Sequence, residues 1–361
     1  MAKSTMSLST MSLLIGSIEP YSGKSGTIVG LAHQFKQKGL SVSYGKPVGT
    51  SFQSDLAEDD VQFMQQLLGL SDSHVRSPLF YLNPETVEKS LYEKDVRDYT
   101  VELKNYLNSI EGDICILEGA GSLSEGTLFN LSVPQIAEIL DLQVLLVTRY
   151  TSPLIVDSLL KAKLELGDHL LGAIINDIPL DAVEDCQTLL KPFLEKHNIP
   201  VLGLLPRSSL LRSVSVREIA KQLKAEILCR PDRLDLMVES LTIGAMNVNA
   251  AIEYFRKGQN MAVITGGDRT DVQLAALETS TSCLILTGHI APNPLILSRA
   301  EYLEVPILSV DLDTLTAVEI VDQAFGKARI QEPIKVECMQ QLMNTYFDLE
   351  RLLNLLSFHK L

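Results

Sequence analysis

Cysteine is scarce in this chain of 361 residues, and its five cysteines stand far apart (Cys115, Cys186, Cys229, Cys283 and Cys338). No two of them have the C-x-x-C spacing, and the six histidines show no ligand spacing either. An odd number of scattered thiols argues against a disulfide framework and against a structural metal site. We therefore expect reduced thiols in a cytoplasmic protein. No serine–histidine–aspartate nucleophile system is recognisable.

Positive charge is also in short supply, with 31 lysines and arginines against 45 aspartates and glutamates and a formal net charge of −14. Basic residues form no cluster, so we expect no nucleic-acid partner. No apolar run approaches the roughly 18–20 residues that span a bilayer, so we expect no membrane span. Residues 1–12 lack the basic leader and apolar core of a signal peptide, and we expect a flexible tail there.

Short apolar runs alternate with amphipathic stretches of helical length from Leu13 onward. This alternation is typical of an α/β fold with a parallel sheet wrapped by helices. The segments 27–38 and 154–166 have helical spacing, and residues 55–108 are expected to add an extra helix pair. The expected strands are Leu13–Ile15, Val42–Tyr44, Ile114–Leu117, Val144–Val147, Leu170–Ile175 and Val201–Leu205.

The rhythm breaks at residues 206–214, where polar and turn-forming residues place a domain boundary. We expect a first domain over 13–206, a smaller α/β domain over 215–330, and a C-terminal amphipathic helix within 331–361. In the second domain the expected strands are 261–264, 283–286 and 307–310. The expected helices are 216–224, 249–257, 271–277, 294–302 and 314–325, and the tail is expected to be helical over 336–356.

The segment from Gly16 to Ser25 follows the first strand and opens the first helix. Glycines let backbone N–H groups converge on phosphate oxygens, and the helix N-terminus adds partial positive charge. Lys24 would reach the terminal phosphates, and the Ser25 hydroxyl would ligate Mg²⁺. Ile18 stands where the usual P-loop has its first glycine, so this loop is longer than standard. The alternative is a helix-capping turn that contains Gly-Lys-Ser by chance.

Three further motifs lie at the ends of expected strands: Gly45-Lys46-Pro47-Val48, Glu118-Gly119-Ala120-Gly121 and the Gly172–Asn176 segment, which itself ends a strand. With the loop, they make residues up to Leu205 resemble the dethiobiotin synthetase and cobyrinate diamide synthase group. The likeness is closest to the related N-terminal domain of long phosphotransacetylases. The resemblance implies that Lys46 lies near substrate and phosphates, that Glu118 helps hold the metal, and that Asn176 contacts adenine.

The same resemblance implies an acidic metal ligand after the second strand, where Asp60 or Asp59 fits best. Each motif keeps a plainer alternative: Lys46 as a strand end, Glu118 as a solvated loop carboxylate, and Asn176 as part of a turn. Our predicted site assigns catalysis to Lys24 and Lys46. It assigns the metal to Ser25, Asp60 and Glu118, and ATP to Gly16, Ser22, Gly23, Lys24, Ser25, Gly26 and Asn176.

Residues 215–330 resemble the DRTGG domain, through Ser215–Ile219, Ile243–Met246 and Thr265–Asp271 among other segments. His289 departs from the family, which often has a glycine there. The resemblance implies a regulatory or oligomerising role. Asp268, Arg269 and Thr270 are the ligand candidates, since they follow two glycines just before a helix. Alternatively, Asp268 caps the helix and pairs with Arg269.

Two functions remain open, with ATP and Mg²⁺ as the expected cofactors of both. The first is a regulatory protein in which nucleotide controls assembly, as a homodimer or larger homo-oligomer, or binding of an unidentified protein partner. The alternative is an ATP-dependent ligase that activates a carboxylate by phosphoryl transfer. A scaffold with a vestigial loop is the least favoured. Acetyl transfer is not expected, because the sequence ends after the second domain.

Overall fold

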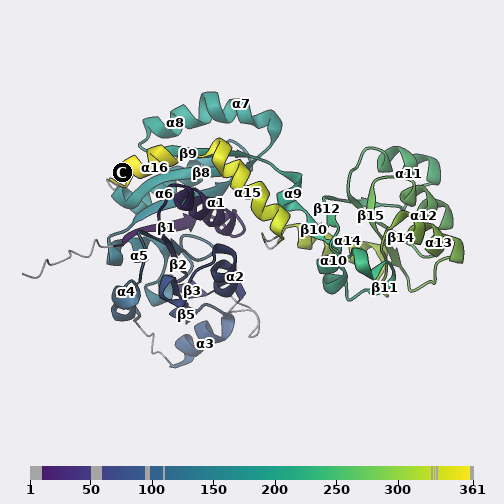
Figure 1. Cartoon of the computed structure of the whole chain (residues 1–361), viewed down its shortest axis with the longest axis horizontal. Helices are drawn as coiled ribbons and strands as arrows, with labels where there is room; N and C mark the ends of the chain where they lie inside the picture. The colour runs from purple at the N-terminus through teal and green to yellow at the C-terminus, as the bar shows by residue number, and fades with distance from the viewer. Residues whose placement is uncertain are drawn as a thin grey trace, which may run out of the picture. The chain divides into compact units, whose positions relative to one another are not determined.

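The computed structural model describes residues 10–49, 59–93, 98–108, 110–326, 328, 330 and 332–357, apart from the side chains of residues 59, 60 and 93. The chain forms two compact units (Figure 1). The first unit comprises Met1–Arg207 and Ile330–Leu361, and the second comprises Ser208–Arg329. The C-terminal segment therefore returns to the first unit after the second unit is complete.

A seven-stranded parallel sheet forms the centre of the first unit, in the order β4-β2-β6-β1-β7-β8-β9. Its strands are β1 (Met11–Ser17), β2 (Val42–Gly45), β4 (Val75–Arg76), β6 (Ile114–Glu118), β7 (Gln143–Arg149), β8 (Leu170–Ile178) and β9 (Val201–Pro206). All six strands expected from the sequence lie within this sheet. Because β1 runs between β6 and β7, the carboxyl ends of the three strands meet at one edge.

Helices surround this sheet. Helix α1 (Lys24–Gln37) packs on β1 and on α15 (Pro333–Tyr346), which also contacts β9. Helices α4, α5, α6 and α8 share an apolar core with Leu14, Val144 and Ala173 of the sheet. The other helices and a parallel strand pair are α2 (Asp59–Leu68), α3 (Pro84–Glu93), α4 (Thr100–Tyr106), α5 (Val133–Leu140), α6 (Ile155–Leu166), α7 (Val183–Asp185), α8 (Lys191–Lys196), β3 (Val48–Gly49) and β5 (Phe80–Tyr81). A π-helical stretch, η5 (Cys186–Leu190), joins α7 to α8.

The tail differs from the single helix expected over 336–356. Two helices occur, α15 and α16 (Leu349–Leu355), separated by Phe347 in extended conformation. Phe347 forms an antiparallel bridge with Gly203, and the Asp348 N–H donates to the Leu202 oxygen at 2.8 Å. Asp348 then caps α16, since its carboxylate accepts from the Arg351 N–H at 2.9 Å. The break arises because edge strand β9 offers free backbone groups, which the tail's apolar spacing does not reveal.

The second unit is built on a five-stranded sheet of order β11-β16-β15-β14-β13, in which only the β11–β16 pair is antiparallel. Its strands are β11 (Glu226–Cys229), β13 (Ser240–Ile243), β14 (Met261–Gly266), β15 (Thr281–Thr287) and β16 (Ile307–Ser309), with β10 (Val214–Ser215) and β12 (Met237–Val238) as a separate pair. The helices are α9 (Ser209–Arg212), α10 (Val216–Leu223), α11 (Val248–Phe255), α12 (Thr270–Leu277), α13 (Pro294–Leu303) and α14 (Thr314–Gly326).

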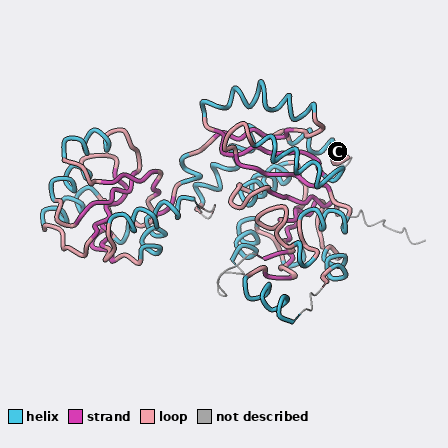
Figure 2. The backbone as a smooth tube through the Cα atoms, turned by 180° about the vertical axis from the view of Figure 1, so that it is seen from behind, coloured by secondary structure: helices cyan, strands magenta, loops and turns pink. Residues whose placement is uncertain are grey.

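Helices lie on both faces of this second sheet (Figure 2). An apolar core lies on each face. One core joins α10 and α14 to residues such as Ile264 and Ile285, and the other joins α11, α12 and α13 to residues such as Val263 and Leu284. Every helix and strand expected here is confirmed, within a few residues at the ends. The edge strands β11 and β13 were not expected, because most of their residues are partly or fully exposed and give no continuous apolar run.

Candidate nucleotide-binding site

The loop between β1 and α1 depends on a glycine at position 23. Gly23 has φ +101°, in the left-handed region that favours glycine. The Nδ2 of Asn176, at the end of β8, donates to the Ser22 oxygen at 2.9 Å. A Cβ at position 23 would overlap this Asn176 amide. The turn therefore brings the start of α1 close against the end of β8, and only glycine fits between them.

Lys24 points into the site rather than out to solvent. Its Nζ donates to the Ser17 Oγ at 2.6 Å and to the Gly121 oxygen at 3.3 Å, and the residue is only 8% exposed. Burial lowers the pKa of the Lys24 ammonium from the ordinary 10.5, and nearby Lys46 lowers it further, while Glu118 acts in the opposite direction. Lys24 is thus a desolvated cation held next to a second lysine, where a polyphosphate would provide the missing negative charge.

Glu118 at the end of β6 lies against the first residues of α1. Its Oε1 accepts from the Ser25 Oγ at 3.1 Å, and its Oε2 accepts from the Tyr44 hydroxyl at 2.7 Å. The residue is 4% exposed, so it is not the solvated loop carboxylate that one alternative suggested. A hydroxyl and a carboxylate side by side are the hard oxygen donors that Mg²⁺ prefers.

Two buried hydroxyls at this end of α1 have no hydrogen-bond partner. They are the Oγ of Ser22 and the Oγ1 of Thr27. Buried polar groups are normally satisfied, so orphaned hydroxyls beside a phosphate-type loop are what a bound anion would complete. Together with the Ser25–Glu118 pair, they make the residues present fit a Mg-nucleotide. Within the described residues, no group of three or more histidine, cysteine, aspartate or glutamate side chains forms a metal site of its own.

Glu19 holds the long loop in place. Its Oε1 accepts from the Arg149 N–H at 2.7 Å, and the Thr148 hydroxyl lies 3.4 Å from both carboxylate oxygens. Thr148 and Arg149 end β7, so Glu19 ties the middle of the loop to the neighbouring strand. The extra length relative to a standard P-loop is accommodated by this attachment.

The remaining predicted residues occupy different settings. Gly16 lies within β1, where a Cβ would come within 2.9 Å of Val133, so its small size serves helix packing. Gly26 lies on α1, and a Cβ there would overlap Ile330. Lys46 follows β2, is 5% exposed and acts on Lys24 through its charge. Asp60, like Asp59, starts α2, but both side chains fall outside the described residues.

Sequence reasoning did not find Ser17, Glu19, Tyr44 and Glu125. Glu125 accepts from the Gly121 N–H at 2.8 Å and is among the charges that act on Lys24. Ser17 and Glu19 could have been identified from their positions inside the loop. Tyr44 could have been identified from its position two residues before Lys46. Polar residues at strand ends beside a phosphate loop are the general sign that would have identified them.

In the second unit, the candidates Asp268, Arg269 and Thr270 lie between β14 and α12. Arg269 donates from Nη2 to the Met246 oxygen at 2.8 Å, and its Nε lies 3.5 Å from the Asp271 carboxylate. The residue at the N-cap of α12 is Arg269, without a side-chain cap, and Asp268 is exposed. The alternative in which Asp268 caps this helix and pairs with Arg269 is therefore wrong. A ligand role for Asp268, Arg269 and Thr270 stays a prediction.

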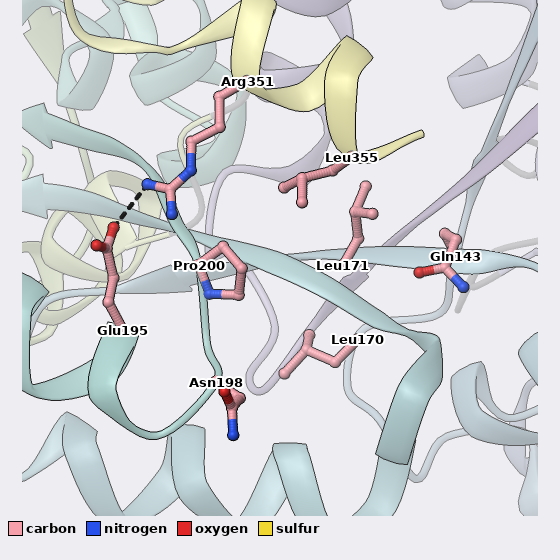
Figure 3. A pocket seen from close by; sticks show the side chains of 8 residues that line it. All are labelled: Gln143, Leu170, Leu171, Glu195, Asn198, Pro200, Arg351 and Leu355. Carbon is pink, nitrogen blue, oxygen red and sulfur yellow. Dashed lines mark hydrogen bonds and ion pairs between the residues drawn. The ribbon is translucent and has the colours of Figure 1, made fainter. Parts of the chain in front are cut away.

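A pocket of about 350 Å³ lies at the opposite edge of the first sheet (Figure 3). It is lined by Gln143, Leu170, Leu171, Glu195, Asn198, Pro200, Arg351 and Leu355. Gln143 and Leu170 begin β7 and β8, whereas Lys24 and Glu118 lie at the carboxyl edge. One wall is closed by the ion pair between Arg351 and Glu195, at 2.6 Å, which fastens α16 to α8. The pocket is therefore separate from the loop site.

Comparison with known sequences agrees with the two-unit organisation. Residues 11–215 match the AAA domain family, and residues 218–324 match the DRTGG domain. Curated relatives include phosphate acetyltransferases of Synechocystis sp., 25% identical over 81% of this chain and 44% of the relative, and of Nitratidesulfovibrio vulgaris, 24% identical over 93% and 50%. The Escherichia coli phosphate acetyltransferase is 22% identical over 90% of this chain and 50% of its own length. The chain thus spans about half the length of the curated relatives it matches.

Solved structures give weaker similarities. The CBS and DRTGG domains of the regulatory region of a Clostridium perfringens pyrophosphatase, complexed with the activator diadenosine tetraphosphate, align with TM-score 0.30 and 19% identity, over 47% of this chain and 86% of that one. Chloroplast FtsY from Physcomitrella patens aligns with TM-score 0.33 and 17% identity, over 54% and 57%.

None of the helices in the described part of the chain is long and apolar enough to cross a membrane. The P-loop arrangement of β1, Lys24 and α1 agrees with the match over residues 11–215, which cover more than half of the chain. The DRTGG match follows it directly. The chain belongs to the AAA domain family and carries a DRTGG domain after its P-loop domain, the architecture of the N-terminal region of long phosphotransacetylases.

Proposed function

We propose that the first unit binds ATP together with Mg²⁺ and that the bound nucleotide controls how the chain assembles or which protein it binds. The observation that carries this proposal is the contact set around Lys24 and Glu118. A buried lysine, a hydroxyl–carboxylate pair and two buried hydroxyls without hydrogen-bond partners all belong to the first turn of one helix and the loop and strand beside it. Their common property is the ability to receive an anion and a hard cation.

Each residue has a distinct task in this proposal. The N–H groups from Gly23 to Gly26 and the start of α1 would cradle the phosphates, with Lys24 as counter-charge. Ser25 and Glu118 would hold Mg²⁺, which neutralises phosphate charge when bound. Tyr44 would keep the Glu118 carboxylate oriented through its hydroxyl contact. Asn176 would fix the Ser22 carbonyl and, by resemblance, face the adenine.

The proposed regulatory role rests on the domains found next to the P-loop domain, in this chain and in its relatives. The matching part of the curated phosphate acetyltransferases is about half of each relative, and a DRTGG domain follows the P-loop domain here. We propose a homodimer or higher homo-oligomer as the nucleotide-dependent assembly, because closed twofold assemblies are the commonest. A phosphate acetyltransferase is the first protein partner we would test.

Size-exclusion chromatography with light scattering tests this role on the full chain, with and without Mg-ATP, alone and with a phosphate acetyltransferase. We expect nucleotide to change the mass of the chain or of its complex, and Lys24→Ala to abolish the change. The exposed Lys161→Ala is the matched control. If saturating nucleotide changed neither assembly nor partner binding, the regulatory proposal would fail while nucleotide binding could stand.

A second candidate is an ATP-dependent ligase, favoured by one observation. Two buried lysines, Lys24 and Lys46, lie close enough for the charge of Lys46 to lower the pKa of Lys24. Paired cations suit a transferring phosphoryl group. Phosphate release from ATP, measured with a panel of small carboxylates, discriminates the two. Turnover with one carboxylate, lost in Lys46→Met, would favour the ligase, and tight ATP binding without turnover would favour the regulator.

A further inference from the structure

Helix α15 lies in close contact with the P-loop helix α1 (Figure 1). A Cβ at Gly30 would lie 2.8 Å from the Met343 Cβ, and one at Gly26 would lie 3.4 Å from the Met339 Sδ. One turn further along α1, the Gln34 Nε2 donates to the Met343 oxygen at 3.0 Å. Later residues of α1 thus contact later residues of α15, so the two helices run in the same direction. The start of α15 therefore lies at the phosphate end of α1.

The chain enters the first unit at this same end. Ile330 is the first residue of the returning segment, and its Cδ1 occupies the space where a Cβ of Gly26 would stand. Gly26 is two residues after Lys24. Lys335, in the first turn of α15, is 1% exposed and pairs with Glu332 at 3.3 Å. This pair lies at the start of α15 itself, where the partly exposed Glu332 carboxylate offsets the charge of the buried ammonium. The entry into α15 therefore lies beside the phosphate end of α1, through the packing of Ile330 over Gly26.

The exit from the first unit is attached to the end of β8, next to the residue that contacts the loop. Arg207, its last residue before the second unit, donates its N–H to the Ile178 oxygen at 2.7 Å and its Nε to Asp177 at 3.0 Å. Asp177 follows Asn176, whose amide holds the Ser22 oxygen. Both covalent connections to the second unit thus begin within one or two contacts of Ser22–Gly26.

From this arrangement we infer that Arg207 and Ile330, the described residues at which the first unit ends and begins again, relay the nucleotide state of the P-loop to the DRTGG unit. The inference rests on the proposed nucleotide binding and specifies its regulation. A shift of the loop on taking up phosphate displaces Asn176 and Gly26, and with them Arg207 and Ile330. The helix pair α1–α15 has no spare space to absorb the shift, because side chains already fill the positions over Gly26 and Gly30.

Hydrogen–deuterium exchange of the full chain, with and without Mg-ATP, tests the relay. We expect ATP to slow exchange in residues 16–30 and also in 332–343 and 204–212, and to change exchange within 216–310. Gly30→Ala, which forces α15 away from α1, is expected to keep nucleotide affinity and to lose the response of 216–310. Gly326→Ala is the control, since a Cβ there meets nothing within 4 Å.

Arg207→Gln provides a second uncoupling variant if Gly30→Ala does not fold, because Arg207 is 40% exposed at its side chain and lies outside the packed helix pair. In Arg207→Gln we expect ATP to change the exchange of residues 216–310 less than in the wild-type chain, while ATP affinity stays the same. Protection confined to 16–30 in the wild-type chain would overturn the relay and leave nucleotide binding intact. A full response of 216–310 in both variants would also overturn it. No protection anywhere and no measurable ATP affinity would overturn both the relay and the proposed function.

Discussion

The side-chain amide of Asn176 donates to the backbone oxygen of Ser22 at 2.9 Å and so joins two segments that lie 154 residues apart in the chain. The contact lies where a strand of the parallel sheet ends and the P-loop turns into its helix. Gly23, next to Ser22, has room for no side chain because the same amide fills the space. The shape of this turn thus depends on a glycine and on a contact with a neighbouring strand.

Glu19 is predicted to contribute to nucleotide affinity without touching the nucleotide. Glu19→Ala removes the acceptor for the Arg149 N–H and frees the middle of the long loop. We expect ATP affinity to fall about tenfold, equivalent to about 1.4 kcal/mol, and Glu19→Gln, which keeps one acceptor oxygen, to lose less. Calorimetric titration measures it, with the surface variant Glu165→Ala as control. Wild-type affinity in Glu19→Ala would refute the attachment role.

Glu118 is predicted to govern the Mg²⁺ dependence of binding. Glu118→Gln removes the negative charge beside the Ser25 hydroxyl, and we expect the Mg²⁺ concentration for half-maximal ATP binding to rise about 10- to 100-fold. Tyr44→Phe, which only releases one Glu118 oxygen, should shift it less. Titration with Mg²⁺ at a fixed ATP concentration measures this requirement in both variants. Glu138→Gln, on the exposed side of α5, is the control. An unchanged Mg²⁺ requirement in Glu118→Gln would remove this carboxylate from the metal site.

The cysteines are predicted to differ sharply in reactivity. Burial raises the pKa of the Cys115 and Cys229 thiols to about 11 and that of Cys283 to about 12. A raised thiol pKa means that almost no thiolate, the reactive form, exists at pH 8. We expect iodoacetamide to alkylate the half-buried Cys338 first and to leave these three unmodified, as read by peptide mass spectrometry. Equal labelling of Cys283 and Cys338 in folded protein would contradict the core described here.

Phe347 is predicted to hold the C-terminal segment on the first unit. It is 7% exposed and bridges Gly203, so Phe347→Ala should reduce the free energy of unfolding by about 3–5 kcal/mol. The chain has no tryptophan, so far-UV circular dichroism in urea is the suitable probe. Tyr92→Ala, at an 85% exposed position, should change it by less than about 0.5 kcal/mol. If the first unfolding transition in urea came at the same urea concentration in Phe347→Ala as in the wild-type chain, the tail would contribute no stability.

Much of the fold could be predicted because parallel strands buried on both faces leave continuous apolar runs. Val144–Val147 and Cys283–Leu286 are examples of such runs. The edge strand Glu226–Cys229 could not be found, since half of its side chains face solvent and its pairing partner is far away in sequence. The helix break at Phe347 could not be predicted for a similar reason. It is caused by a backbone bridge to β9, which the spacing of apolar residues in the tail does not indicate.

Site residues could be predicted where they belong to short sequence motifs that are typical of phosphate and metal binding. Lys24, Ser25 and Glu118 come from two such motifs, and the structure brings them together at one edge of the sheet. Glu19 and Tyr44 act through partners 130 and 74 residues away, so only the folded chain shows their contacts. Gly16 packs closely against Val133, which the sequence did not indicate, and its assignment to the phosphate site stays a prediction.

Calorimetric titration of the full chain with ATP in the presence of magnesium tests the central claim most directly. The account predicts a saturable heat for the wild-type chain and for Lys161→Ala. For Lys24→Ala it predicts an affinity lower by about 10- to 100-fold, because a charge-assisted contact is lost. No heat with any purine triphosphate, or equal affinity with and without the Lys24 ammonium, would contradict the claim that this loop holds a nucleotide.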